Sequence, residues 1–358
     1  MNGQRSRRLI VPFFLRNRGC RNRCVFCNER VIAGNAAPVT EAGVRETVLA
    51  ALAACGGGHD RAEIAFYGGS FTGMPREEQA ALLRAAAALI DEGAACSVRI
   101  STRPDDIDGA VLDYLASMGV GAVEIGAQSL DDAVLRQSKR GHTADDVRRA
   151  VTLCREWGFE TGLHLMAGLP GESRGSFEAS VAEVIRIRPH TVRIHPVIVF
   201  RDTELARLHE QGLYRPLDLA EAVSWCATAL VRLSEAGIPV IRLGLQATDP
   251  MAREGCILAG PWHPSFRCLV EAEIFRDMAA MLMDRAAGGG TEACFRVAPA
   301  DLSNFNGPGG TNRAWLRSRL GGRTIAVRPD PAVPRGALRL QDGLREYGTS
   351  VAEVTGIV

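Results

Sequence analysis

The chain contains almost no lysine: Lys139 is the only one among 358 residues, so arginine supplies nearly all of the positive charge. A large excess of either charge is also absent, because the formal net charge is +1, which gives no global attraction to nucleic acid. No apolar run is long enough to cross a bilayer. The first apolar run, residues 9–15, contains Pro12 and is followed by Arg16, so it predicts a β-strand rather than a secretory signal. We therefore expect a globular protein with no membrane segment.

Clustered cysteine is also scarce, with one exception. Seven of the ten cysteines are scattered along the chain, which is typical of thiols in a reducing compartment and predicts a cytoplasmic protein. The other three, Cys20, Cys24 and Cys27, lie within eight residues in a basic loop after the first apolar run. Thiolates at such tight spacing are the usual ligands of iron–sulfur clusters. Three thiolates on a four-iron cluster leave one iron open to an outside ligand, as a catalytic cluster requires.

Two other interpretations of this trio are weaker. A structural zinc site needs a fourth ligand, usually from a second Cys or His pair, and the sequence has no second C-x-x-C. A disulfide framework is typical of small secreted domains and fits a chain of this length poorly.

Apolar, often β-branched runs alternate with stretches of helical periodicity over the first 250 residues. The predicted strands are residues 9–15, 63–67, 97–101, 122–125, 160–166, 191–199 and 240–243. The predicted helices are residues 41–55, 76–91, 144–157, 175–186 and 219–236. Repeated βα units predict an α/β fold with a parallel sheet, closed or partly closed into a barrel whose active site lies at the carboxyl ends of the strands. After about residue 250 the alternation fades, so we expect a core of residues 1–250 and a smaller, irregular extension of residues 251–358.

Several strand ends carry residues suited to binding a ligand. Gly68 and Gly69 follow the second strand, and without a Cβ their backbone can approach a ligand closely, although a plain turn is the simpler interpretation. Ser70 comes next, and Ser101 ends the third strand with a hydroxyl. Gln128 ends the fourth strand.

Four basic side chains follow or lie on the later strands. Arg140, twelve residues after Gln128, matches a carboxylate bidentately. His164 lies on the fifth strand, where a buried core histidine and a ligand contact are equally good explanations. On the sixth strand Arg193 and His195 alternate with apolar residues and so share one face, which we expect to line the substrate end of a barrel.

The cysteine trio and these strand ends together resemble the radical S-adenosylmethionine (SAM) superfamily. Over residues 8 to about 250 the motifs Ser-Thr-Arg-Pro-Asp, Val-Glu-Ile-Gly-Ala-Gln-Ser, Arg-Gly-His-Thr and Gly-Leu-Pro-Gly resemble the radical SAM domain of the Elongator catalytic subunit family. The Gln and Arg positions are also similar to those of oxygen-independent coproporphyrinogen oxidase. The resemblance implies a partial (β/α)6-type barrel, a 4Fe–4S cluster on the trio, and SAM on the open iron.

The resemblance also implies a set of SAM contacts. It assigns the SAM carboxylate to Arg140, the amino group to the glycine pair, and the adenine to Phe26. The family's usual acidic residue after the glycines is Ser70 here. The full set implied is Phe26, Gly68, Gly69, Ser70, Ser101, Gln128, Arg140 and His164.

Three functions remain open at this point. The first is a radical SAM enzyme that acts on RNA, with SAM, tRNA and an electron donor such as flavodoxin or ferredoxin as partners. RNA would bind to a basic rim around the cluster, formed by the arginines at 5, 7, 8, 16, 18, 21, 23 and 30. The arginine-rich rim is equally well explained as solvated surface. The second is a radical SAM enzyme acting on a small molecule or tetrapyrrole. The third is a non-catalytic protein that carries a cluster or binds haem or RNA. The Elongator family joins this domain to an acetyltransferase, and no acetyl-CoA loop is evident here.

Overall fold

A computed structural model of the chain describes residues 9–34, 38–55, 61–253, 255–286, 292–319 and 324–354. Its central element is a seven-stranded sheet in the order β1-β2-β3-β4-β5-β6-β8. The strands are β1 Leu9–Phe14, β2 Ala62–Tyr67, β3 Ala95–Thr102, β4 Val120–Gln128, β5 Glu160–Ala167, β6 Thr191–Pro196 and β8 Val240–Leu243. The pairs from β1 to β5 are parallel.

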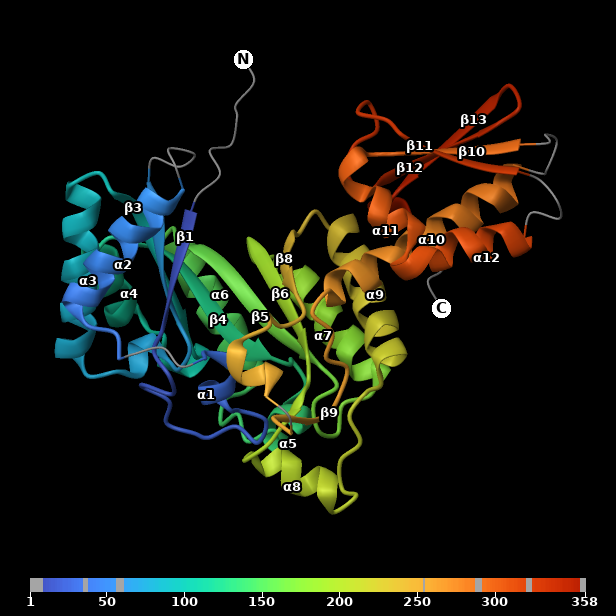
Figure 1. The fold of residues 1–358 in the computed structure, drawn as a ribbon. Coiled ribbons are helices and arrows are strands. Elements are labelled where there is room, and N and C mark those ends of the chain that lie inside the picture. The colour runs from blue at the N-terminus through green and yellow to red at the C-terminus, as the bar shows by residue number, and fades with distance from the viewer. Residues whose placement is uncertain are drawn as a thin grey trace. The chain divides into compact units, whose positions relative to one another are not determined.

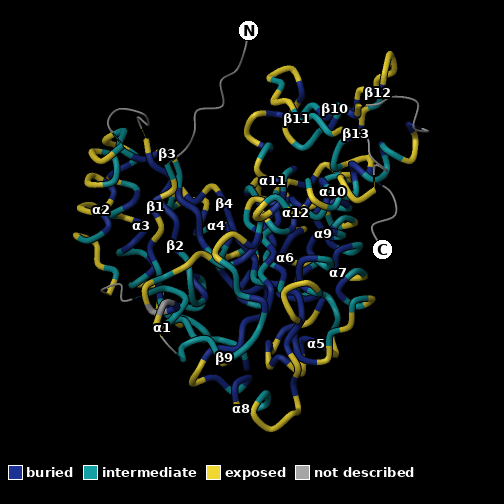
Figure 2. The backbone as a smooth tube through the Cα atoms, turned by 45° about the vertical axis from the view of Figure 1, so that its right-hand side comes forward, coloured by how far each residue is buried: buried dark blue, intermediate teal, exposed yellow. Residues whose placement is uncertain are grey.

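Helices connect successive strands, as right-handed crossovers of a parallel sheet require. They are α1 Glu29–Ile32, α2 Glu41–Ala54, α3 Arg76–Asp91, α4 Gly109–Ser117, α5 Asp132–Gln137, α6 Ala144–Glu156, α7 Arg174–Ile187 and α8 Glu204–Glu210. The sheet curls into the half-barrel that the sequence predicted, with helices along its outside (Figure 1). The first five residues of β2 are buried, as expected of a strand covered on both faces (Figure 2).

The chain forms two compact units. The first comprises residues 1–193, 197–216 and 246–260, and it includes a short antiparallel pair, β7 Val199–Phe200 with β9 Ile257–Ala259. The second comprises residues 194–196, 217–245 and 261–358. The predicted domain boundary at residue 250 stays a prediction.

The second unit is more regular than the fading alternation of the sequence indicated. It holds helices α9 Leu219–Glu235, α10 Phe266–Ala286, α11 Leu302–Asn306 and α12 Thr311–Arg319. Its four-stranded sheet runs β11-β10-β12-β13, formed by β11 Thr324–Pro329, β10 Glu292–Val297, β12 Ala337–Asp342 and β13 Arg345–Ser350. Phe295 and Phe305 pack with ring centroids 5.2 Å apart in its core. These strands are short and polar on one face, which explains why periodicity alone did not reveal them.

Strand positions agree closely with the sequence prediction in the first unit. The main difference is the run of residues 191–199, which the structure divides between β6 and β7 at Val197 and Ile198. Among the helices that the structure describes, none combines the length and the apolar character needed to span a membrane.

Candidate functional site

The loop that carries the cysteine trio follows β1 and enters the carboxyl edge of the sheet. Cys24 is buried, whereas Cys20 and Cys27 are half-buried, and all three thiols are free. The adjacent Val25 anchors the loop, because its amide donates to the Ser138 carbonyl at 3.3 Å and its carbonyl accepts from the Leu205 amide at 2.8 Å. The side chain of Phe26 packs against an apolar cluster of Val25, Val134, Leu169, Val197, Val199, Leu205, Ala206 and Tyr214.

Main-chain contacts fix the start of the loop against the turn after β2. Gly69 has a φ of +64°, and a Cβ there would lie 2.3 Å from the Arg18 carbonyl oxygen. Gly19 has a φ of +73°, and its Cβ would lie 2.1 Å from the Ser70 carbonyl oxygen. The Ser70 amide donates to the Arg18 carbonyl at 2.8 Å. Both glycines are therefore needed to let two backbones touch, and the SAM contact expected of Gly68 and Gly69 stays a prediction.

A carboxylate lies beside the thiols. Glu29 accepts from the Gly69 amide at 2.8 Å and from the Asn17 amide. Burial, followed by the charge of Glu29, raises the pKa of Cys20 to about 11 and that of Cys27 to about 12. Cys24 also raises both values, so the three thiols lie within one another's electrostatic field. Without a bound cation the Cys20 and Cys27 thiols stay protonated at neutral pH.

A positive side chain reaches the trio from the other side. The Nη1 of Arg140 donates to the Cys24 Sγ at 3.0 Å, and its Nη2 donates to the Gly126 carbonyl at 2.6 Å. A Cβ on Gly126 would lie 3.1 Å from the Gln128 Nε2 and 3.3 Å from the Arg140 Nη2. The side chains of Gln128 and Arg140 thus approach each other over Gly126, at the inner face of the sheet.

Two of these side chains carry buried polar atoms that nothing satisfies. The Oε1 of Gln128 and the Nε of Arg140 have no hydrogen-bond partner in the part of the chain that the structure describes. Gln128 also has a φ of 71°, which is costly for a residue with a side chain and is typical of functional sites. Unsatisfied buried donors and acceptors need an explanation, and a polar ligand beside Cys24 supplies one.

Across the described residues, no three cysteine, histidine or acidic side chains are gathered closely enough to hold a metal ion. Thiols must lose their protons to bind a metal, so metal binding is coupled to the arrangement and the charge of its ligands. The donor set nonetheless fits a cluster: three soft sulfur ligands on one short loop, within one another's field, beside unsatisfied polar atoms.

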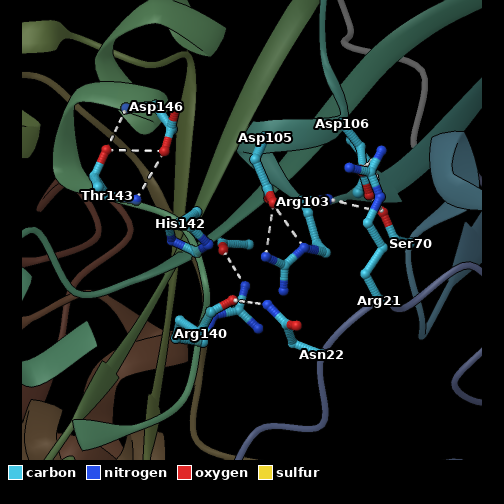
Figure 3. A network of polar contacts seen from close by, with 12 residues as sticks. Arg21, Asn22, Ser70, Arg103, Asp105, Asp106, Arg140, His142, Thr143 and Asp146 are labelled. Carbon is cyan, nitrogen blue, oxygen red and sulfur yellow. Dashed lines mark hydrogen bonds and ion pairs between the residues drawn. The ribbon is translucent and has the colours of Figure 1, made fainter. Parts of the chain in front are cut away.

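Ser70 takes a structural position. It is fully buried, and its hydroxyl donates to the Asp106 Oδ2 at 2.6 Å and accepts from the Arg103 amide at 3.2 Å. Arg21 pairs with the other oxygen of Asp106 at 2.8 Å, which ties the cysteine loop to the turn after β3 (Figure 3). A direct contact of Ser70 with SAM stays a prediction.

The other predicted residues lie on the inner face. Ser101 is half-buried near the end of β3 and, by strand alternation, shares its face with Arg99. His164 is half-buried on β5 and shares its face with Gly162. The sites of Arg5, Arg7 and Arg8, expected in the basic rim, lie outside the described residues.

A basic pocket of about 610 Å³ lies beside the cysteine loop. It is lined by Arg21, Asn22, Arg23, Arg136, Lys139, Gly141, His142 and Thr143. Asn22 donates to the Arg140 carbonyl at 3.4 Å, so one wall of the pocket joins directly to the residue that contacts Cys24 (Figure 3). Burial, followed by the charge of Arg140, lowers the pKa of His142 to about 3, so this ring is neutral.

Sequence reasoning did not single out some important side chains. Arg103 is almost fully buried, is held by Asp105 at 2.9 Å, and leaves its Nη1 without a partner among the described residues. The Ser-Thr-Arg-Pro-Asp motif contained both residues, so a signal existed. Glu29 and Tyr67 had none, because only the packing of distant segments reveals their contacts.

Two family descriptions match this chain. Residues 15–184 match the Radical SAM superfamily, and residues 189–276 match the Radical SAM C-terminal domain. The chain therefore belongs to the radical SAM superfamily and is an enzyme. This confirms the family and the partial barrel that the sequence predicted.

Its relatives support the likeness to the Elongator catalytic subunit. A tRNA uridine(34) acetyltransferase from Methanocaldococcus jannaschii is 32% identical over 127 residues, which cover 35% of this chain and 24% of the relative. One from Dehalococcoides mccartyi is 35% identical over 120 residues, covering 33% and 26%. The chain thus spans about a quarter of the length of these curated relatives. A solved structure of Elp3 from Methanocaldococcus infernus, with an N-terminal deletion, shares the fold with a TM-score of 0.57 at 21% identity, covering 78% of this chain and 63% of that one.

Proposed function

We propose that this enzyme holds a 4Fe–4S cluster on Cys20, Cys24 and Cys27, cleaves SAM reductively, and modifies RNA, with tRNA as the first candidate. The observation that carries the proposal is the meeting of Arg140 with the Cys24 thiol beside an unsatisfied Gln128. When bound, the reduced cluster supplies the electron that splits SAM into methionine and a 5′-deoxyadenosyl radical.

The chain's own residues bind and orient SAM in this proposal. Arg140 and Gln128 offer donors and an acceptor to the amino-acid end of SAM, next to the thiol loop. The half-buried side chains of Ser101 and His164 face the same concave surface from β3 and β5. The remaining expected contacts are Phe26, Gly68, Gly69 and Ser70.

RNA as the acceptor is supported by charge as well as by the relatives. The basic pocket places Arg21, Arg23, Arg136 and Lys139 together without an acidic residue in its lining. Arg23 and Arg136 have no ion-pair partner in the described parts of the chain, so their charge is available to phosphates. The relatives reported above are named as tRNA uridine(34) acetyltransferases. An electron donor such as flavodoxin or ferredoxin completes the proposed set of partners.

The test is anaerobic. The protein is reconstituted with iron and sulfide, given SAM and dithionite, and assayed for 5′-deoxyadenosine with and without bulk tRNA. We expect 5′-deoxyadenosine that increases with tRNA, and stimulation that weakens as salt rises because phosphate contacts are lost. Product without stimulation by tRNA, together with tight tetrapyrrole binding, would favour a small-molecule acceptor. A full cluster that never cleaves SAM under any of these conditions would contradict the enzymatic proposal.

A further inference from the structure

One hydrogen bond spans the concave face of the sheet. The Nη2 of Arg193 on β6 donates to the Tyr67 hydroxyl on β2 at 2.7 Å. Three strands separate β2 from β6, so a flat sheet would place them about 19 Å apart. The bond therefore forms only because the sheet curls, and it lies inside the half-barrel rather than along its surface.

A buried ion network lies beneath this bond. Glu124 on β4 pairs with the Arg193 Nε at 2.6 Å and with the Arg99 Nη1 at 3.3 Å. Arg99 also pairs with Glu63 at 3.0 Å, and the side chains of both are at least 94% buried. A Cβ on Gly162 would lie 3.2 Å from the Glu124 Cγ, so this glycine gives the carboxylate room to cross β5. Tyr67 and Glu124 thus hold Arg193 directly, and Arg99 holds Glu124 from below.

The upper part of the network is open. The Arg193 side chain is 18% exposed, against 6% for Glu124, and Tyr67 is half-buried. The Arg193 guanidinium lies 4.8 Å from the centre of the Tyr67 ring. No hydrogen bond of the Arg193 Nη1 occurs within the described ranges, and burial followed by the charge of Glu124 raises the pKa of Tyr67 to about 12. A guanidinium edge and a protonated hydroxyl therefore remain available as donors.

Tyr67 is also next to the expected SAM site in sequence. It directly precedes Gly68 and Gly69, whose turn packs against the cysteine loop. A group bound to Tyr67 and Arg193 thus lies on the inner face of the sheet. Gln128 and Arg140 approach each other on the same face. Tyr67 is also the last residue of β2, and active sites of βα barrels lie at the carboxyl ends of the strands.

We propose that Tyr67 and Arg193 form the acceptor site, which receives a flipped-out nucleobase through a carbonyl oxygen. The inference rests on the proposed RNA function and names the residues that read the base. The Arg193 Nη1 and the Tyr67 hydroxyl donate hydrogen bonds to the base carbonyl.

Charge favours a neutral base over an anionic group. The network contains three carboxylates, Glu63, Glu124 and Glu160, against the two arginines, and the Glu160 side chain is 34% exposed. A carboxylate ligand would enter a region that is already net negative. A carbonyl oxygen adds no charge and still uses the free donors.

The test uses Arg193→Met in the reconstituted full chain with bulk tRNA, and Arg149→Met, an exposed helix arginine paired with Asp146, as the matched control. We expect the tRNA-dependent part of 5′-deoxyadenosine formation at saturating tRNA to fall about tenfold or more, on the scale of losing one hydrogen bond from a charged group. The cluster absorbance should stay at the level of the control. Tyr67→Phe keeps the ring and removes one donor, so its loss should be smaller.

A binding measurement separates this inference from the proposed function. RNA containing 4-thiouridine is irradiated with the protein, and we expect a crosslink in the tryptic peptide of residues 62–76 that Arg193→Met abolishes and Arg149→Met keeps. Such a crosslink supports the acceptor site even if SAM cleavage itself fails. A crosslink and a tRNA response that both survive in Arg193→Met would overturn the inference, and so would loss of the cluster in that variant, which would show a structural role.

Discussion

The concave face of the sheet carries two layers of polar side chains, and the two layers differ in how completely their polar atoms are paired. Near the strand ends, Gln128, Arg140 and Arg103 each leave a buried polar atom without a partner in the described residues. Deeper in the half-barrel, Arg99 is paired with Glu63, Glu124 and Glu160. Both layers are polar and enclosed, so burial alone does not distinguish them. Hydrogen bonding does distinguish them: the charged groups of the deep layer are paired with one another, whereas the upper layer has buried polar atoms that no described residue satisfies.

The difference also separates stability from binding. Removing one member of a satisfied buried network leaves an uncompensated charge and destabilises the fold. Removing a member of the unsatisfied layer weakens ligand binding and leaves the fold largely intact. Four substitutions test this contrast, beginning with the largest expected effect.

Cys24→Ala should abolish the cluster and all SAM cleavage, because two thiolates cannot replace three on the open-site cluster. The measurements are iron and sulfide content, visible absorbance and 5′-deoxyadenosine formation. Cys96→Ala, an exposed cysteine outside the trio, is the control and should retain all three. Cleavage that persists in Cys24→Ala would show that the trio has been assigned wrongly.

Arg99→Met should lower the free energy of unfolding by about 3–5 kcal/mol, because three carboxylates lose their common partner in a buried place. Denaturant unfolding measures the change. The exposed Arg149→Met should cost no more than about 1 kcal/mol. Equal losses in the two variants would remove the contrast between the deep layer and the surface.

Arg140→Ala should weaken SAM binding by about 1.5–3 kcal/mol, the value of a hydrogen bond to a charged group, and leave the cluster in place. Equilibrium binding to the reconstituted protein measures this change, with Arg149→Ala as the control. Unchanged affinity would argue against the proposed SAM contact. Loss of the cluster would instead assign Arg140 to the support of Cys24, which its Nη1 contacts at 3.0 Å.

Glu172 is a buried carboxyl group whose hydrogen bonds are satisfied, and it should affect stability rather than binding. Burial raises its pKa to about 8, although its carboxyl accepts from the Gly168 and Leu169 amides. Because the folded protein holds this proton more tightly than the unfolded chain does, the protonated carboxyl contributes its full stability at a pH below the pKa of the unfolded chain. That contribution is lost as the pH rises through the folded pKa of about 8. We expect wild-type stability to fall between pH 5 and pH 8 and this fall to shrink in Glu172→Gln. Glu77→Gln, in the first turn of α3, should keep the wild-type profile.

Local patterns predicted much of the fold and part of the site. The strands that carry Gln128 and His164 were expected from periodicity, and the cysteine trio from spacing, because both signals are local in sequence. The Tyr67–Arg193 bond joins residues 126 positions apart and depends on the curl of the sheet, which no window of sequence encodes. The contact expected of Ser70 with the ligand stays a prediction, and packing alone reveals that its hydroxyl joins two turns.

Glu124 has a consequence for how this enzyme can diversify. Its carboxylate serves Arg99 and Arg193 at once, so it keeps a cationic neighbour whichever residue occupies position 193. A lineage can therefore exchange the side chain that meets the acceptor without rebuilding the barrel beneath it. Position 193 is a place where selection can try new substrates while the inherited scaffold stays the same.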